Sequence, residues 1–224
     1  YCYCKRYMEL NLFVYVLLIF CIPYLLYSNF RIQPRKGFSI LFISIISSVV
    51  VLKFSLFSLI GIIPLISSLL INNKKYYKYL YGASFLILNY QLSMDLDLSI
   101  FTLILSNLFP ISLISGVFSS MMIGHWFLVD PTISKQGMKK IALFCTFHSL
   151  TLIPLVFFEV IGEDIDNLFK NVILFLYFST SILSFGSFKS LGEKSYTGVM
   201  ASTGLSYLSL IVSLGASGGL LLLA

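Results

Sequence analysis

Residues 135–166, KQGMKKIALFCTFHSLTLIPLVFFEVIGEDID, contain the pattern that decides the fold of this chain. Three lysines stand at the start, an apolar run over 141–161 follows, and Glu163, Asp164 and Asp166 stand at the end. About 20 apolar residues are needed for a helix to cross the hydrocarbon core of a bilayer, which is about 30 Å thick. Because cytoplasmic loops of membrane proteins collect Lys and Arg, this stretch predicts a transmembrane helix with a defined orientation.

The composition extends this interpretation to all 224 residues. The chain is 58% hydrophobic and 11% charged, whereas a soluble domain is about 25% charged. We therefore expect a single all-α transmembrane domain over 1–224, a polytopic helix bundle with short loops and no soluble catalytic module. The net charge of +6 is better explained by basic loops beside anionic lipid headgroups than by nucleic acid.

Two apolar stretches are too long for one simple span. Stretch 38–71 has basic loops at both ends, so we expect a hairpin of two short helices that meet near Lys53. Stretch 98–129 joins an acidic loop to a basic one and should cross once, as a helix broken near Asn107 and Pro110, because proline removes a backbone donor. The sequence then predicts about eight spans, at 9–28, two within 38–71, and at 79–94, 98–129, 141–161, 168–188 and 197–222.

Opposite charges fall on opposite sides of this arrangement. The basic loops are 29–37, 73–79, 130–140 and 189–196, and they hold every base except Lys5, Arg6, Lys53 and Lys170. With these loops in the cytoplasm, both termini are predicted outside. Lys5 and Arg6 agree with the rule if the native chain starts at Met8, so residues 1–7 are hypothesised to lie outside the native chain.

Small residues mark the helix surfaces that we expect to pack against other helices. One stripe with a spacing of four consists of Ser112, Gly116, Ser120 and Gly124. The last span holds Gly198 with Ser202 and Ser206, and then Gly215 with Gly219. Residues four apart lie on one helix face, and small residues let helix backbones approach closely in lipid. The partner surface is either within the same chain, on a second copy, or on another membrane protein.

The two histidines are the candidate cofactor ligands. His125 and His148 stand toward the basic side of adjoining spans, and their predicted depths differ by about one helical turn. Facing imidazoles could bind haem b or a metal ion of unknown type. The alternatives are packing, anchoring at the interface beside the single Trp126, and a proton or substrate path.

A second set of polar side chains is predicted in the outer half of the membrane: Asn89, Gln91, Asn107 and Glu159. They could line a substrate path that opens outward, or they could form interhelical hydrogen bonds. Cys145, His148 and Glu159 also fall on roughly one face of a helix. Lys53 and Lys170 are predicted at a depth similar to that of Glu159 and are its candidate ion-pair partners.

One motif resembles a known set of proteins. The run GHWFLVDP over 124–131, with TGLSYL over 203–208, is similar to uncharacterised bacterial multi-pass integral membrane proteins with a GHW(F/Y)L motif. The resemblance covers the second half of the chain and implies a multi-pass protein of the cell (inner or plasma) membrane. It implies no activity for any residue.

Three functions are therefore expected as alternatives. The first is a membrane subunit of a larger complex, redox-linked through His125 and His148. The second is a small-solute transporter with an outward-facing polar cavity, and the third is a structural or assembly protein. An enzymatic activity of its own is least favoured and no catalytic residue is predicted, because the sequence has no phosphate loop, HExxH pair or GxSxG elbow.

Overall fold

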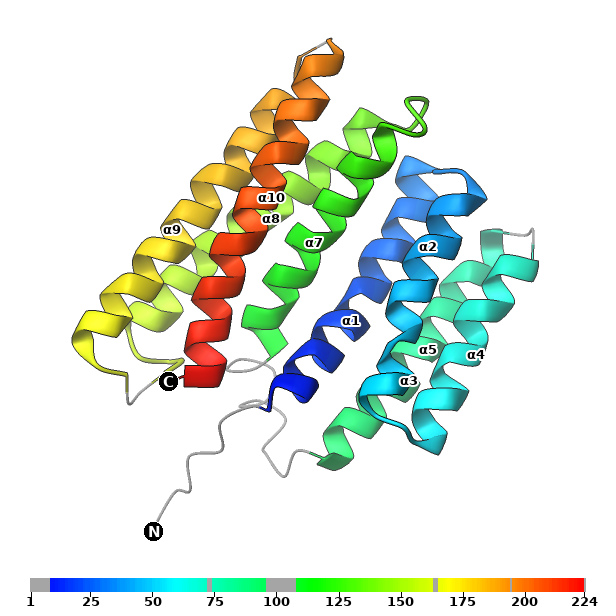
Figure 1. Ribbon diagram of the computed structural model, residues 1–224, viewed down its shortest axis with the longest axis horizontal. Helices are drawn as coiled ribbons and strands as arrows, with labels where there is room; N and C mark the ends of the chain where they lie inside the picture. Colours follow the sequence, from blue (N-terminus) through cyan, green and yellow to red (C-terminus); the bar gives the residue numbers. More distant parts are fainter. Residues whose placement is uncertain (1–8, 72–73, 96–107, 163–164, 194, 224) are drawn as a thin grey trace.

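The computed structural model describes residues 9–71, 74–95, 108–162, 165–193 and 195–223 (Figure 1). Every regular element in these ranges is helical, which confirms the predicted all-α class. In chain order they are α1 (Leu10–Tyr27) with its π-helical extension η1 (Ser28–Ile32), α2 (Lys36–Ser47), α3 (Val49–Leu52), α4 (Leu56–Leu70), α5 (Lys74–Asp95), α7 (Phe109–Phe127), α8 (Lys135–Phe157), α9 (Asn167–Ser190), and α10 (Tyr196–Gly218) with its π-helical extension η3 (Gly219–Leu223).

Within the described ranges, four helical segments are long and apolar enough to cross a membrane: Leu10–Ile32, Lys135–Phe157, Asn167–Ser190 and Tyr196–Leu222. The segments Lys36–Leu52 and Leu56–Leu70 are apolar but shorter. Large apolar side chains also point outward, as with Phe147 at 61% and Phe175 at 68% exposed. Apolar surface of this extent marks a membrane or protein contact, so length, composition and surface together indicate a membrane protein.

The helices run side by side and alternate in direction (Figure 1). The turns from α1 to α2, from α7 to α8 and from α9 to α10 lie at one end, together with the end of α4 and the start of α5. These segments carry the clustered bases, so we call this end the basic end. The start of α1 and the close of η3 lie at the opposite end (Figure 1).

The stretch 38–71 is broken at Lys53, as predicted. Lys53 ends α3 with extended backbone at a φ of −145°, and α4 starts after Ser55, whose hydroxyl accepts a hydrogen bond from Ser58 N at 3.0 Å. Such a serine cap satisfies a backbone donor that the first turn leaves unpaired. The predicted break near Asn107 and Pro110 is only partly visible: α7 begins at Phe109 with Pro110 in its first turn, and Asn107 lies outside the described residues.

Two predicted loops are helical instead. Helix α8 begins at Lys135 rather than near residue 141, and α5 begins at Lys74 rather than near residue 79. Long lysine stems lie along a helix and carry the ammonium group to the membrane surface. In α8, Lys135 Nζ donates to the carbonyls of Glu193 and Ser195 at 3.3 and 3.1 Å. A cluster of lysines therefore marked the end of a helix here and not a loop.

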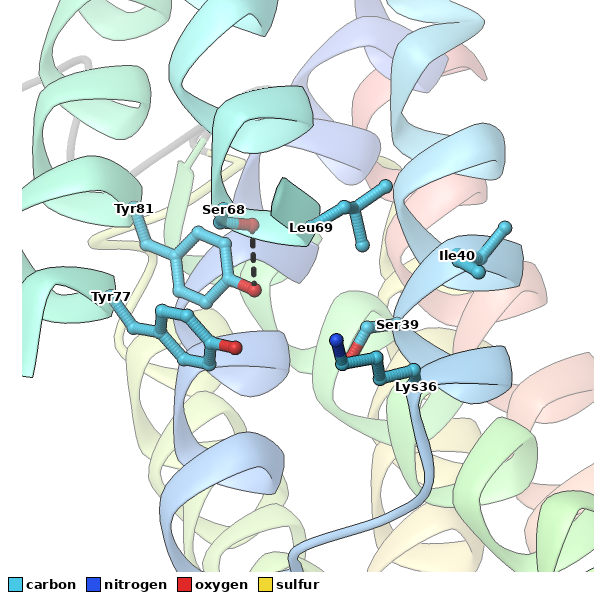
Figure 2. Close-up of a pocket in the computed structure, with 7 residues that line it drawn as sticks. All are labelled: Lys36, Ser39, Ile40, Ser68, Leu69, Tyr77 and Tyr81. Atoms are coloured by element: carbon cyan, nitrogen blue, oxygen red, sulfur yellow. Dashed lines mark hydrogen bonds between the residues drawn. The ribbon is translucent and has the colours of Figure 1, made fainter. Parts of the chain in front are cut away.

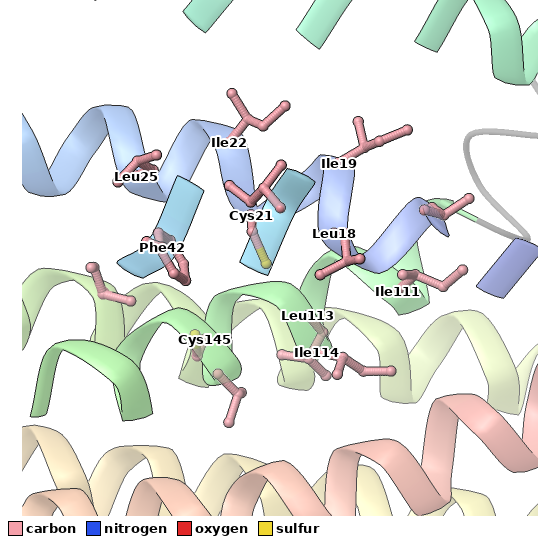
Figure 3. Packing of buried hydrophobic residues seen from close by; sticks show 14 of the residues in the cluster. Leu18, Ile19, Cys21, Ile22, Leu25, Phe42, Ile111, Leu113, Ile114 and Cys145 are labelled. Carbon is pink, nitrogen blue, oxygen red and sulfur yellow. The ribbon is translucent and has the colours of Figure 1, made fainter. Parts of the chain in front are cut away.

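Helix α1 lies at the centre of the core. It packs against α7 on one side and against α2, α3 and α5 on the other. Figure 3 shows the packing of buried apolar side chains where α1 meets α7 and α2, with Cys145 of α8 nearby; the labelled side chains are Leu18, Ile19, Cys21, Ile22, Leu25, Phe42, Ile111, Leu113, Ile114 and Cys145. Helices α7 to α10 pack together as a second group, in which α10 has its most extensive contact with α9.

Candidate functional site

The structure does not bring the two histidines together. His148 lies beside the first turn of α7, with Nε2 at 3.0 Å from the carbonyl oxygen of Phe109, whereas His125 lies in the last turn of α7. About 24 Å of helix separates the levels of Phe109 and His125 at 1.5 Å per residue. The expectation of similar depth was wrong because α8 starts six residues earlier than the sequence pattern indicated, so His148 lies deeper.

His148 is buried, with 6% of its surface exposed, in an aromatic environment. Because a carbonyl can only accept, Nε2 carries the proton that it donates to Phe109 O. The ring centroid lies 4.2 Å from that of Phe109 and 5.6 Å from that of Phe144. The Nδ1 atom has no hydrogen-bond partner among the described residues, which leaves one lone pair available.

This environment does not fit a haem. Phe109 and Phe144 lie against the His148 ring, and Nε2 is already bonded. A haem on Nδ1 would have to displace these aromatic side chains, and His125 lies too far away to be the second ligand. No group of three or more His, Cys, Asp or Glu side chains suited to a metal ion occurs in the parts of the chain that the structure describes.

The GHWFLVDP run joins three parts of the molecule. A Cβ built on Gly124 would lie 2.5 Å from Thr203 Oγ1 on α10, so Gly124 allows α7 and α10 to approach closely. The Trp126 ring packs against Gly37 and Phe38 at the start of α2. Thr203 begins the TGLSYL run, and the two runs that carry the family resemblance are thus in direct contact.

Asp130, in the loop after α7, makes further contacts between the GHWFLVDP run and the rest of the chain. It is 1% exposed, and its Oδ1 accepts hydrogen bonds from Thr132 Oγ1 at 2.5 Å and Thr132 N at 3.4 Å. Its Oδ2 lies 3.5 Å from Arg35 Nε in the turn before α2. The Thr132 hydroxyl, above all, and then Arg35 hold the pKa of the Asp130 carboxyl below its usual value. The motif therefore ties the α7–α8 loop to the α1–α2 turn.

The polar residues that were predicted to line a substrate path in the outer half of the membrane do not lie together. Gln91 is buried between α1, α4 and α5, where its Oε1 accepts from Tyr15 OH at 3.0 Å and Ser58 Oγ at 2.8 Å. Asn89 donates to Phe85 O of its own helix at 2.7 Å. Glu159 lies in the other half of the chain, and Asn107 is outside the described ranges. These side chains do not line a common cavity.

Glu159 lies beyond the end of α8, which stops at Phe157. Its φ is +58°, so the predicted face shared with Cys145 and His148 does not extend to it. Its carboxylate pairs with Lys170 Nζ at 2.8 Å, and Lys170 is one of the two partners that the sequence suggested. The Glu159 side chain is 54% exposed and that of Lys170 is 14% exposed, so the pair lies at the molecular surface with its lysine largely covered.

The small-residue stripes contact helices of the same chain. Ser112 Oγ lies 3.5 Å from His148 Nε2, and a Cβ on Gly116 would meet Tyr24 of α1 and Cys145 of α8. Ser120 lies 3.5 Å from Ser206 of α10. At the far end of α10 and in η3, Cβ atoms on Gly215 and Gly219 would face Leu176 and Phe169 of α9.

A line of buried hydroxyl groups is the most extensive polar feature of the second helix group. Five serines occupy one face of α10: Ser202, Ser206, Ser209, Ser213 and Ser217. Their spacing of three or four residues keeps them on one side of a helix. From Ser202 to Ser217 the line covers about 22 Å at 1.5 Å per residue, most of the roughly 30 Å of a hydrocarbon core.

Hydroxyls on neighbouring helices pair with this face. Ser187 of α9 lies 2.7 Å from Ser202 and 3.3 Å from Ser206, and Ser184 lies 3.0 Å from Ser209. Further along, Ser217 donates to Pro110 O of α7 at 3.1 Å and therefore accepts from Tyr177 of α9 at 3.0 Å.

A small cavity of about 10 Å³ lies along this line. It is lined by Val117, Ser120, Ala142, Cys145, Ser184, Ser187, Ser206 and Ser209. Sequence reasoning recognised Ser202 and Ser206 but missed the rest of the line. The sequence shows serines three or four apart in two consecutive spans, but small residues at this spacing are also typical of ordinary helix packing.

These features indicate a helical membrane protein with a line of buried hydroxyl groups. No protein-family model, curated protein or solved structure matches the chain. The resemblance to bacterial multi-pass membrane proteins thus stays a prediction, and functional inference depends on the chemistry of the helix bundle itself.

Proposed function

We propose that this protein is a small-solute permease of a cell membrane and that its path runs between α7, α8, α9 and α10. The observation that carries the proposal is the face of five serines on α10, paired with hydroxyls of α9 and α7. Buried polar groups in a membrane are costly and tend to mark substrate paths. The proposed path therefore follows this hydroxyl line and not the outer polar residues predicted from the sequence.

Hydroxyl chemistry specifies the class of solute. A serine hydroxyl both donates and accepts hydrogen bonds, so a row of them can replace the water around a small uncharged polar molecule. The residues that line the cavity carry no charged side chain, and an ion would lose its hydration there without compensation. The expected substrates are therefore small neutral molecules with hydroxyl or amide groups.

The cavity has the size of about one water molecule, which corresponds to a closed path. Opening requires α9 and α10 to separate slightly from α7. The serine pairs suit such a movement, because interhelical hydrogen bonds in membrane proteins contribute under about 1 kcal/mol on average and each serine can instead donate to its own helix.

The proposal includes an orientation. Eight helical segments pass along the bundle (α1, α2 with α3, α4, α5, α7, α8, α9 and α10), and we propose that they are eight spans with the basic end in the cytoplasm. Both termini are then outside. Tags placed at either terminus should be accessible from outside intact cells, and a tag in the α9–α10 turn should not be.

Solute flux into proteoliposomes tests the permease. Vesicles with the protein should take up glycerol or urea faster than protein-free vesicles in stopped-flow light scattering. Ser206→Val removes a hydroxyl and adds bulk inside the path, and should abolish the difference. Ser179→Val is the matched control on α9, because among the described residues Ser179 bonds only to Phe175 O of its own helix.

The flux assay also separates the permease from the other expectations. Wild-type vesicles no more permeable than empty vesicles to glycerol, urea and water would refute the permease. A redox-linked subunit is less supported, because His125 and His148 are far apart. An assembly protein is less supported because the small-residue stripes already contact their own chain.

A further inference from the structure

A second cavity lies at the basic end, between α2, α4 and α5, and is separate from the hydroxyl line. It has a volume of about 40 Å³ and is lined by Lys36, Ser39, Ile40, Ser68, Leu69, Tyr77 and Tyr81 (Figure 2). The ammonium end of Lys36 and the hydroxyl ends of the two tyrosines point toward the same space (Figure 2). A polar cavity of this size has room for about three water molecules.

Hydrogen bonds fix the wall of this cavity before any ligand arrives. Ser39 Oγ donates to Asn29 Oδ1 at 2.8 Å, and Asn29 Nδ2 donates to Tyr81 OH at 2.9 Å. Ser68 Oγ lies 3.2 Å from the same tyrosine oxygen. Tyr77 OH donates to Ile71 O at 3.2 Å. Side chains that are already ordered lose little entropy on binding.

The charge of the site selects an anion. Lys36 is the one charged residue among the seven that line the cavity, and none of the seven is acidic. Arg31, Arg35, Lys75 and Lys78 lie at the same end of the molecule and add to the positive potential. An ammonium group with hydroxyls beside it is a common arrangement for phosphate oxygens.

The surroundings of the cavity indicate that the anion carries an apolar tail. Ile40, which lines the cavity, is 51% exposed, and Leu70, the neighbour of the lining residue Leu69, is 82% exposed. Both belong to short apolar helices on the outside of the bundle. A ligand that lies here would place an anionic group on Lys36 and hydrocarbon against these side chains.

We propose that this cavity binds the phosphate group of an anionic phospholipid from the leaflet at the basic end. Lys36 pairs with the phosphate, Tyr81 OH, which accepts from Asn29 and Ser68, donates its own proton to a phosphate oxygen, and the acyl chains lie on Ile40 and Leu70. A zwitterionic lipid carries a compensating cation and binds more weakly. The site is independent of the proposed permease path.

Native mass spectrometry with added phosphatidylglycerol tests the lipid site. The purified protein should bind one phosphatidylglycerol more tightly than phosphatidylcholine. Lys36→Met should weaken that binding about fivefold, because one lysine at a membrane surface contributes about 1 kcal/mol. Lys36→Arg should bind as the wild type does.

Lys140→Met is the matched control, since it removes an equal charge from an exposed position at the same end. Equal binding by Lys36→Met and Lys140→Met, with both variants helical by circular dichroism, would overturn the proposal. Full competition by soluble glycerol phosphate would overturn the assignment to a lipid, because the acyl chains would then contribute nothing.

Discussion

Replacement of Gly124 by alanine should weaken the contact between α7 and α10. The added Cβ would lie 2.5 Å from Thr203 Oγ1, 3.3 Å from its Cβ and 3.4 Å from its Cγ2. Thr203 Oγ1 also donates to Val199 O at 2.8 Å, which holds the threonine side chain in this orientation. We therefore expect the two helices to separate by several tenths of an ångström along a seam that also holds Ser120 and Ser206.

The expected cost follows from overpacking of a helix contact. Inserting a methyl group into a packed interior costs about 1–3 kcal/mol, and the gain from replacing glycine within a helix is at most about 1 kcal/mol. We expect a net loss of about 1–2 kcal/mol in the free energy of unfolding. Gly204→Ala measures the gain in helix propensity alone, because a Cβ on Gly204 would meet nothing within 4 Å.

Unfolding by a denaturing detergent in mild micelles measures these changes. Fluorescence of Trp126, the single tryptophan, reports the region beside the substitution, and circular dichroism reports the whole bundle. The double variant Gly124→Ala with Thr203→Ala should recover most of the loss, because only a 3.3 Å contact with Cβ remains. If Gly124→Ala and Gly204→Ala unfold alike, or if Thr203→Ala gives no recovery, the close approach of α7 and α10 is wrong.

Three further substitutions test contacts in other parts of the molecule. Gln91→Leu removes the buried amide oxygen that accepts from the Tyr15 and Ser58 hydroxyls and should cost about 1–3 kcal/mol in the same unfolding assay. The pKa of the Asp130 carboxyl is lowered in the folded protein, so its contribution to stability is full above about pH 4, the ordinary pKa of Asp, and is lost as the pH falls through the lower folded-state pKa. Thr132→Val should therefore move the pH midpoint of acid unfolding upward. An unchanged midpoint would count against the hydrogen bond. Lys170→Met removes a surface ion pair and should change stability by less than about 1 kcal/mol, so a larger loss would mean that the pair is structurally important.

Charge position predicted much of the architecture because it reports where a chain leaves the membrane. The break at Lys53 and the clustering of bases at one end both follow from this rule. The same rule failed at Lys135, since it cannot distinguish a lysine in a loop from a lysine in the first turn of a helix. That error of six residues, from 141 to 135, placed His148 too close to the surface and suggested a pairing with His125.

The candidate path could be predicted only in part. The serines of α10 are visible in the sequence as a repeating pattern, but their pairing with Ser184 and Ser187 depends on which helices are neighbours. Helix neighbours are set by tertiary packing, such as the contact of Gly124 with Thr203. No pattern within one span contains that information, so the sequence could not predict that Gln91 and Glu159 belong to different helix groups.

The short helices of the first group have a consequence for the membrane itself. Helix α4 has 15 residues and a length of about 22 Å, well under the roughly 30 Å of an average hydrocarbon core. A hydrophobic mismatch of this size thins the bilayer locally, at a cost of a fraction of a kcal/mol per Å. In the proposed eight-span arrangement α4 crosses the membrane, so this side of the protein is expected to favour thin bilayers, and vesicles of shorter acyl chains should stabilise it more than thick, sterol-rich ones.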